Sequence, residues 1–165
     1  MKKKILVIIG IFLMILTGCE LGNTPTSKVE DLLSRYQMLD DSIAISYVDL
    51  ANDSDIDNDM KERYEALIRK QYQNLSYEIK EESIDGNIAT VTVEIEVVDY
   101  ASILEKYDKE NLDDNYHETV LKAMEDTTEK ATYTIEFITN KDKEGDWKLE
   151  PLNTLQHKKM LGINL

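Results

Sequence analysis

A single cysteine, Cys19, is the residue of this chain whose surroundings most clearly suggest chemistry. It closes the motif Leu16-Thr17-Gly18-Cys19, in which the two residues before the cysteine are small. Small residues at a cleavage point let the extended chain enter a peptidase site. A thiol in this place is the nucleophile that accepts a diacylglyceryl group before cleavage. The motif is a lipobox, and it predicts lipid attachment at Cys19.

The residues before Cys19 have the order of an export signal. Three lysines at positions 2–4 precede an apolar run of 12 residues from Ile5 to Leu16, which is too short to span about 30 Å of hydrocarbon. We expect residues 1–18 to be a cleaved lipoprotein signal peptide. Residues 19–24 would form the lipidated cysteine and a short tether, and residues 25–165 a single domain on the outer face of the cytoplasmic membrane. With lipid on the only cysteine, this domain would have neither a disulfide nor thiol catalysis.

An acidic run before the helix that we expect over about 58–75 is the second candidate site. It places a carboxylate at every second position, on Asp53, Asp55, Asp57 and Asp59. This spacing resembles part of a calcium-binding loop. The run departs from that pattern because Asn58 stands where glycine is preferred, and Tyr64 stands where a bidentate glutamate is needed. The favoured interpretation is that Asp57, Asn58 and Asp59 cap the helix that follows, with calcium binding as the alternative.

Other catalytic and cofactor motifs are not found in the sequence. His117 and His157 are far apart, and neither has a metal-binding or catalytic spacing, so both are expected to be surface side chains. No nucleophile elbow, phosphate-binding glycine loop or dinucleotide fingerprint occurs. The many acidic residues could include a glycosidase-like pair, but the separation that defines such a pair is spatial. We therefore expect no cofactor and no catalysis.

The net charge of the chain limits the kinds of molecule that it can bind. The net charge is −14, and loss of the three lysines at positions 2–4 would take it to −17. Nucleic acid is an unsuitable partner because phosphate binding needs a clustered basic surface. Like charges would also hold the domain away from an anionic bilayer, so contact with the membrane is expected through the lipid on Cys19. A protein at the cell surface is the expected further partner.

Hydrophobic periodicity predicts helices in the first half of the mature chain. Pro25 suits an early position of the first helix, and Ser27-Lys28-Val29-Glu30 matches a capping box. A second, weaker helix is expected over about 42–51 and a third over about 58–75. The apolar stripe of the first helix consists of Val29, Leu32, Leu33, Tyr36 and Leu39.

The second half alternates between apolar and polar residues, which is typical of strands. Strands are expected over 77–84 and 88–99 with a turn at Asp85-Gly86-Asn87, then around 132–137 and 147–150, with helices near 117–129 and 154–161. The resulting fold class is α+β, with N-terminal helices packed on a curved, mainly antiparallel four-stranded sheet. Such a sheet can wrap its apolar face around the helices.

The aromatic residues divide into two expected groups. The first group would face inward as core or cavity-lining residues, and it consists of Tyr36, Tyr64, Tyr77, Tyr133 and Trp147. The second group would be more exposed, and it consists of Tyr72, Tyr100, Tyr107 and Tyr116. The segment from Tyr100 to Tyr116 is therefore the expected interaction surface.

Several short motifs give the chain a resemblance to known proteins. They are Asn23-Thr24-Pro25-Thr26, Lys28-Val29-Glu30, Arg35-Tyr36-Gln37, Tyr77-Glu78-Ile79-Lys80, Ile84-Asp85-Gly86 and Ala89-Thr90-Val91-Thr92-Val93. With these motifs the chain resembles a group of small, uncharacterised lipoproteins of low-GC Gram-positive bacteria. The order of its elements is also similar to the cystatin-like or nuclear-transport-factor-like cone fold. That fold serves ligand binding, protein interaction and some enzymes, so the resemblance implies a location and a shape.

These observations predict a membrane-anchored bacterial lipoprotein that acts as a non-catalytic binding or interaction module. One alternative is a cone-fold hydrolase or isomerase, which would need a polar cleft and a carboxylate of raised pKa. A calcium-binding surface protein is another alternative, and a structural or immunity-type partner of a membrane protein is a further one.

Overall fold

The computed structural model describes residues 22–40, 56–107 and 115–163. Within these ranges the chain forms an α+β fold with a four-stranded antiparallel sheet, which confirms the expected class. The expected helix at 42–51 lies outside the described residues. The elements are α2 (Pro25–Gln37), α3 (Asn58–Gln73), β1 (Ser76–Asp85), β2 (Ile88–Val98), α4 (Ala101–Lys106), α5 (Tyr116–Asp126), β3 (Lys130–Lys141), β4 (Trp147–Leu149) and α6 (Thr154–Met160).

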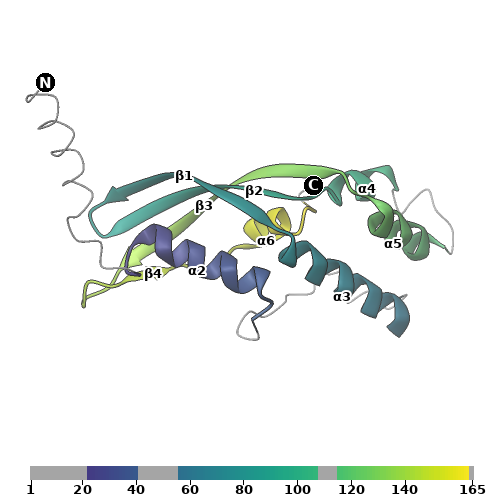
Figure 1. Cartoon of the computed structure of the whole chain (residues 1–165), viewed down its shortest axis with the longest axis horizontal. Coiled ribbons are helices and arrows are strands. Elements are labelled where there is room, and N and C mark those ends of the chain that lie inside the picture. Colours follow the sequence, from purple (N-terminus) through teal and green to yellow (C-terminus); the bar gives the residue numbers. More distant parts are fainter. Residues whose placement is uncertain (1–21, 41–55, 108–114, 164–165) are drawn as a thin grey trace, which may run out of the picture.

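The sheet follows the chain in the order β1-β2-β3-β4 (Figure 1). Gly86 has a φ of +60°, which glycine adopts without strain, and it allows the tight turn between β1 and β2. A β-bulge between Ile79 and Glu81 interrupts the register of β1. Burial alternates strictly along β2, as expected for a strand with one buried face and one solvent-facing side.

The helices bury the apolar face of this sheet. Val29 and Leu33 of α2 are fully buried, as are Val91 and Val93 of β2 and Phe137 of β3. Helix α2 contacts β2 and β4, whereas α3 contacts α5 at the other end of the molecule (Figure 1). The space between the sheet and the helices is therefore filled with close-packed side chains, as in an ordinary protein core.

The start of α2 corrects the predicted capping box. Thr24 is the N-cap, not Ser27. The Thr24 hydroxyl accepts from the Ser27 backbone N–H at 3.1 Å, and the Ser27 hydroxyl accepts from the Thr24 backbone N–H at 2.9 Å. Because Pro25 suits the first helical position, Ser27 falls at the third, where its hydroxyl does what Glu30 was expected to do.

Two tyrosines that were expected to be exposed are core residues. Tyr72 is 1% exposed and Tyr100 is 4% exposed. The Tyr72 ring lies 4.9 Å from that of Tyr36 on α2. The buried face of α3 therefore includes Tyr72 and is wider than a single row of residues at helical spacing. Burial raises the pKa of Tyr72, and it raises the pKa of Tyr100 to about 12. The segment that begins at Tyr100 is thus anchored in the core at its first residue.

The two histidines are half-buried, which corrects their expected surface position. His157 on α6 packs edge-on against Tyr36, with 6.4 Å between ring centroids. His117 on α5 packs edge-on against Tyr116 at 5.0 Å. Burial disfavours the charged imidazolium and lowers the pKa of His157. Both rings serve the packing of their helices.

Gln71 joins three parts of the chain through its buried side-chain amide. Its Nε2 donates to the carbonyl oxygens of Val98 at 2.8 Å and Leu161 at 3.0 Å, and its Oε1 accepts from the Val98 N–H at 3.0 Å. The residue after Leu161 is Gly162, with a φ of +70°. A Cβ there would lie 2.0 Å from the Val98 oxygen, so only glycine lets the C-terminal segment approach this closely.

Candidate functional site

The described chain begins close to the predicted lipid site and is held there by Asn23. The Asn23 Nδ2 donates to Asp146 Oδ1 at 3.0 Å, and its Oδ1 accepts from the Trp147 N–H at 3.0 Å. Lys28 Nζ donates to the Gly22 carbonyl oxygen at 3.0 Å. We call these contacts the Asn23 clamp. They hold the start of the domain against the β3–β4 turn (142–146).

The clamp limits how far Cys19 can lie from the domain. Cys19 itself is outside the described residues, and four peptide units separate it from Asn23. At full extension these units span at most about 14 Å. A lipid on Cys19 would therefore be tied closely to the end of the molecule that carries the β3–β4 turn.

Only the second half of the acidic run, with Asp57 and Asp59, lies within the described residues. Asp57 is the N-cap of α3, and its Oδ1 accepts from the Met60 N–H at 2.9 Å. Asp59 lies in the first turn of α3, where an acidic side chain complements the helix dipole. Asp53 and Asp55 lie outside the described residues. The capping interpretation of Asp57 is confirmed, and calcium binding by the run stays a prediction.

A different acidic cluster, in the β3–β4 turn, was missed by the sequence reasoning. Asp142, Glu144 and Asp146 bring carboxylate oxygens within 4.8 Å of one another. The signal was present as acids at every second position around Gly145, but the same residue types form ordinary turns. Sequence spacing alone does not distinguish a cluster of carboxylates from an ordinary turn.

The hydrogen bonds of this turn account for the arrangement of its carboxylates. Asp142 Oδ1 accepts the backbone N–H groups of Glu144 and Asp146, each at 2.9 Å. These bonds, that from Asp146 first, hold the pKa of Asp142 below its usual value. Asp146 in turn accepts from Asn23. Oxygen ligands of this type suit a hard cation, but here two of the three carboxylates stabilise the turn and the clamp.

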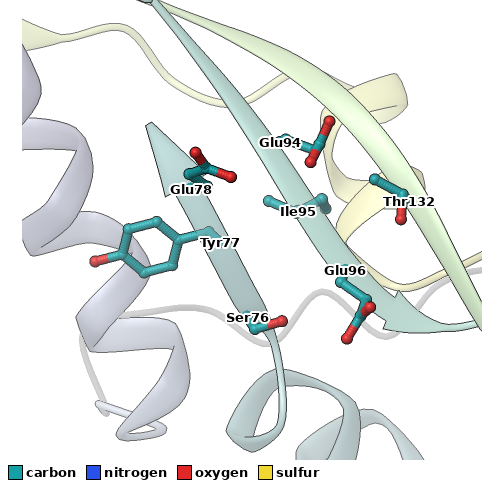
Figure 2. A pocket seen from close by; sticks show the side chains of 7 residues that line it. All are labelled: Ser76, Tyr77, Glu78, Glu94, Ile95, Glu96 and Thr132. Atoms are coloured by element: carbon teal, nitrogen blue, oxygen red, sulfur yellow. The ribbon is translucent and has the colours of Figure 1, made fainter. Parts of the chain in front are cut away.

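The solvent-facing side of the sheet carries a shallow acidic groove of about 210 Å³ (Figure 2). Lys80 Nζ bridges Glu78 at 2.6 Å and Glu94 at 3.1 Å, and Lys130 forms an ion pair with Glu96. The groove is lined by Ser76, Tyr77, Glu78, Glu94, Ile95, Glu96 and Thr132.

This groove is smaller than the roughly 300–1,000 Å³ of typical small-molecule sites, and its three glutamates are paired with lysines. A general acid needs a raised pKa. Outside the groove, hydrogen bonds from Arg63 lower the pKa of Glu125, and backbone N–H groups lower that of Asp142. The geometry of the groove suits polar contact with a partner better than acid catalysis.

A second groove, of about 410 Å³, separates α6 from the edge of β3. Gln156 Nε2 donates to the Glu136 carbonyl oxygen at 2.6 Å, and Lys159 Nζ donates to that of Thr134 at 2.7 Å. These side chains hydrogen-bond to carbonyl groups of β3 that the short strand β4 does not pair with. Helix α6 thereby protects an otherwise open sheet edge from pairing with another strand.

Comparisons with known proteins do not identify the chain. No protein-family model, curated protein or solved structure matches it. Among the helices of the described residues, none has the length and apolar character needed to cross a bilayer.

Proposed function

We propose that this chain is a lipid-anchored binding module on the outer face of the cytoplasmic membrane. The signal-like segment 1–18 and the small residues before Cys19 support lipid attachment, as does the resemblance to small lipoproteins of Gram-positive bacteria. The observation that carries the proposal is the Asn23 clamp. It supports an anchored domain, because Asn23, four residues after the predicted acceptor Cys19, is already bonded to the fold.

A binding role is favoured by the way in which the domain uses its polar groups. Its interior is filled by apolar side chains such as Leu33, Val93 and Phe137, each fully buried. The acidic groups of its described residues lie on the outside, where many pair with lysine or arginine or accept backbone N–H groups. Such a surface supports complementary electrostatic contact with a partner protein.

Replacement of the predicted acceptor thiol tests the anchor. Cys19→Ala should abolish incorporation of labelled fatty acid and leave an uncleaved precursor or a released, exported chain, because no other thiol exists. Thr17→Ala is the matched control, since it keeps a small residue before the cleavage point and should still be labelled. Failure of the unaltered chain to take up fatty acid would contradict the proposal.

Crosslinking in intact cells tests the binding role. The unaltered chain should give a specific adduct with a membrane or cell-surface protein, which is identified after purification. The Cys19→Ala chain should lose this adduct, since release from the membrane lowers the local concentration of the module. A purified domain that turns over a model ester or an isomerisable substrate, and forms no adduct, would favour the enzyme alternative.

A further inference from the structure

Two exposed isoleucines flank the turn between β1 and β2. Ile84 is 54% exposed and Ile88 is 52% exposed, so two large apolar side chains lie in solvent at the tip of one hairpin. Ile84 lies opposite Ala89, and Ile88 lies opposite Asp85. Because side chains alternate between the two faces of a sheet, the isoleucines project from opposite faces of the hairpin tip.

The hairpin tip belongs to the same end of the molecule as the Asn23 clamp. The Asn87 carbonyl oxygen accepts from the Lys141 N–H at 2.7 Å, which ties the tip to the β3–β4 turn that Asn23 holds. Figure 1 shows the β1–β2 turn, β4 and the start of α2 together, with α3 and α5 at the opposite end. The predicted lipid site and the exposed isoleucines therefore share one pole of the fold.

We propose that this pole rests on a phospholipid bilayer, with Ile84 and Ile88 entering its interfacial layer. The inference depends on the proposed lipid attachment at Cys19. Lipid chains in the hydrocarbon place Cys19 at the headgroups, and the tether then keeps Asn23 within about 14 Å of them. Apolar side chains on such a pole gain by leaving water for the interface.

The charge of this pole is mixed. Lys141, Lys143 and Lys148 lie among five acids, Glu82, Asp85, Asp142, Glu144 and Asp146, so attraction to anionic lipid is not what holds the pole, and the contact depends on the lipid and the isoleucines. Screening over about 8–10 Å weakens repulsion from the acids at the far end of the molecule. Charge repulsion could hold the domain away from the bilayer only if a long tether allowed it. The Asn23 clamp leaves at most about 14 Å between Asn23 and Cys19.

Site-specific labels on the lipidated chain test the orientation. Ile84→Cys and Ile88→Cys each carry an environment-sensitive fluorophore, and the chains are reconstituted in vesicles of phosphatidylcholine and phosphatidylglycerol. Leu155→Cys is the matched control, because Leu155 is equally exposed at 53% but lies on α6, and Ala66→Cys marks the far end on α3. We expect nitroxide lipids to quench the two tip labels at least about twofold more than the two controls.

Further variants separate the possible failures. An unaltered chain that does not float with vesicles, or whose Cys19 accepts the fluorophore, would overturn the lipid attachment itself. A floating chain whose tip labels are quenched no more than Ala66→Cys would overturn the orientation alone. In Asn23→Ala, flotation should persist while quenching at the tip falls toward that of the controls. Unchanged quenching in this variant would overturn the role of the clamp.

Discussion

At the scale of single residues, the fold depends on a few buried polar groups that local patterns do not reveal. Gln71 lies on the buried face of α3, where a polar side chain needs hydrogen-bond partners. Its amide hydrogen-bonds to the backbone of Val98, at the end of β2, and to that of Leu161, in the C-terminal segment. Without this amide the Val98 N–H and the Leu161 carbonyl would lose the partner that it supplies, which is costly for backbone groups away from water. The Val98 carbonyl also accepts from the Tyr100 N–H at 3.1 Å.

Gln71→Leu should destabilise the domain by about 1–3 kcal/mol for each backbone group left unsatisfied. Urea unfolding, followed by circular dichroism, measures the loss. Gln73→Leu is the matched control on the same helix, since Gln73 is exposed, and its change should stay within about 0.5 kcal/mol. Equal stability of the two variants would show that the Gln71 amide contributes nothing to the fold.

His157 should make stability depend on pH in the mildly acidic range. Its pKa in the folded state is lowered by burial, so the unfolded chain, with a pKa of about 6.5, binds the proton more readily. The contribution of this group is complete above the unfolded pKa and is lost as pH falls below it. Between pH 7.5 and pH 5.5 the unaltered domain should therefore lose more stability than His157→Gln, in parallel urea titrations. Parallel losses in the two proteins would refute this assignment.

At the scale of elements, caps and bridging side chains set where helices begin and what they contact. Arg63 of α3 forms a bidentate pair with Glu125, at 2.8 Å for each bond, and a third bond to Glu118 at 2.8 Å. These contacts join α3 to α5 across the far end of the molecule. The Glu125 hydrogen bonds are the main cause of the raised pKa of Arg63, so the guanidinium keeps its charge.

The start of α3 separates the capping role of the acidic run from calcium binding. Asp57→Ala should cost about 0.5–2 kcal/mol because the Met60 N–H loses its acceptor, and Asp59→Ala should cost less, about 0.3–1 kcal/mol, through the helix dipole. Thermal melts of the unaltered domain should coincide in millimolar calcium and in chelator. A calcium-dependent rise in Tm that Asp53→Ala with Asp55→Ala removes would instead favour the calcium-binding alternative.

At the scale of the whole molecule, β4 connects the clamped end to the core. Because Trp147 alternates with Lys148 and shares its face with Leu149, the sequence also predicts that its indole is buried against the helices that carry Leu33 and Leu67. Trp147 is 6% exposed, and β4 contacts α2, the helix of Leu33. The helix of Leu67, α3, extends toward the other end of the sheet (Figure 1). Lys141 Nζ lies 5.5 Å from the centre of the Trp147 ring, so a lysine also covers the indole.

Trp147 should behave as a packed residue and not as a cavity wall. Its emission should lie at short wavelength and resist iodide quenching, and Trp147→Ala should cost about 3–5 kcal/mol because the void cannot close. Tryptophan fluorescence and urea unfolding measure both effects on the only tryptophan of the chain. Strong quenching together with a small loss of stability would identify a partly solvated pocket wall.

Local sequence determined most of the elements and the buried sides of α2 and β2, whereas the short helix α4 was not predicted. Alternation along β2, the stripe of Val29 and Leu33, and the turn at Gly86 were all correct, because side-chain periodicity and backbone sterics act within a few residues. The capping box was displaced by three residues, since several hydroxyl-bearing residues near Pro25 could serve as the cap. Asp57 at the start of α3 was predicted correctly, because an N-cap acts within one helical turn.

Tertiary structure alone decided the contacts between distant parts of the chain. Asn23 meets Asp146 across 123 residues, and Gln71 meets Leu161 across 90. Neither the burial of Tyr72 and Tyr100 nor the shared pole of Asn23 and the isoleucine tip follows from spacing. The physical reason is that these partners are chosen by chain topology and by the packing of whole elements, whereas the sequence pattern records only each residue's preference for water or for the core.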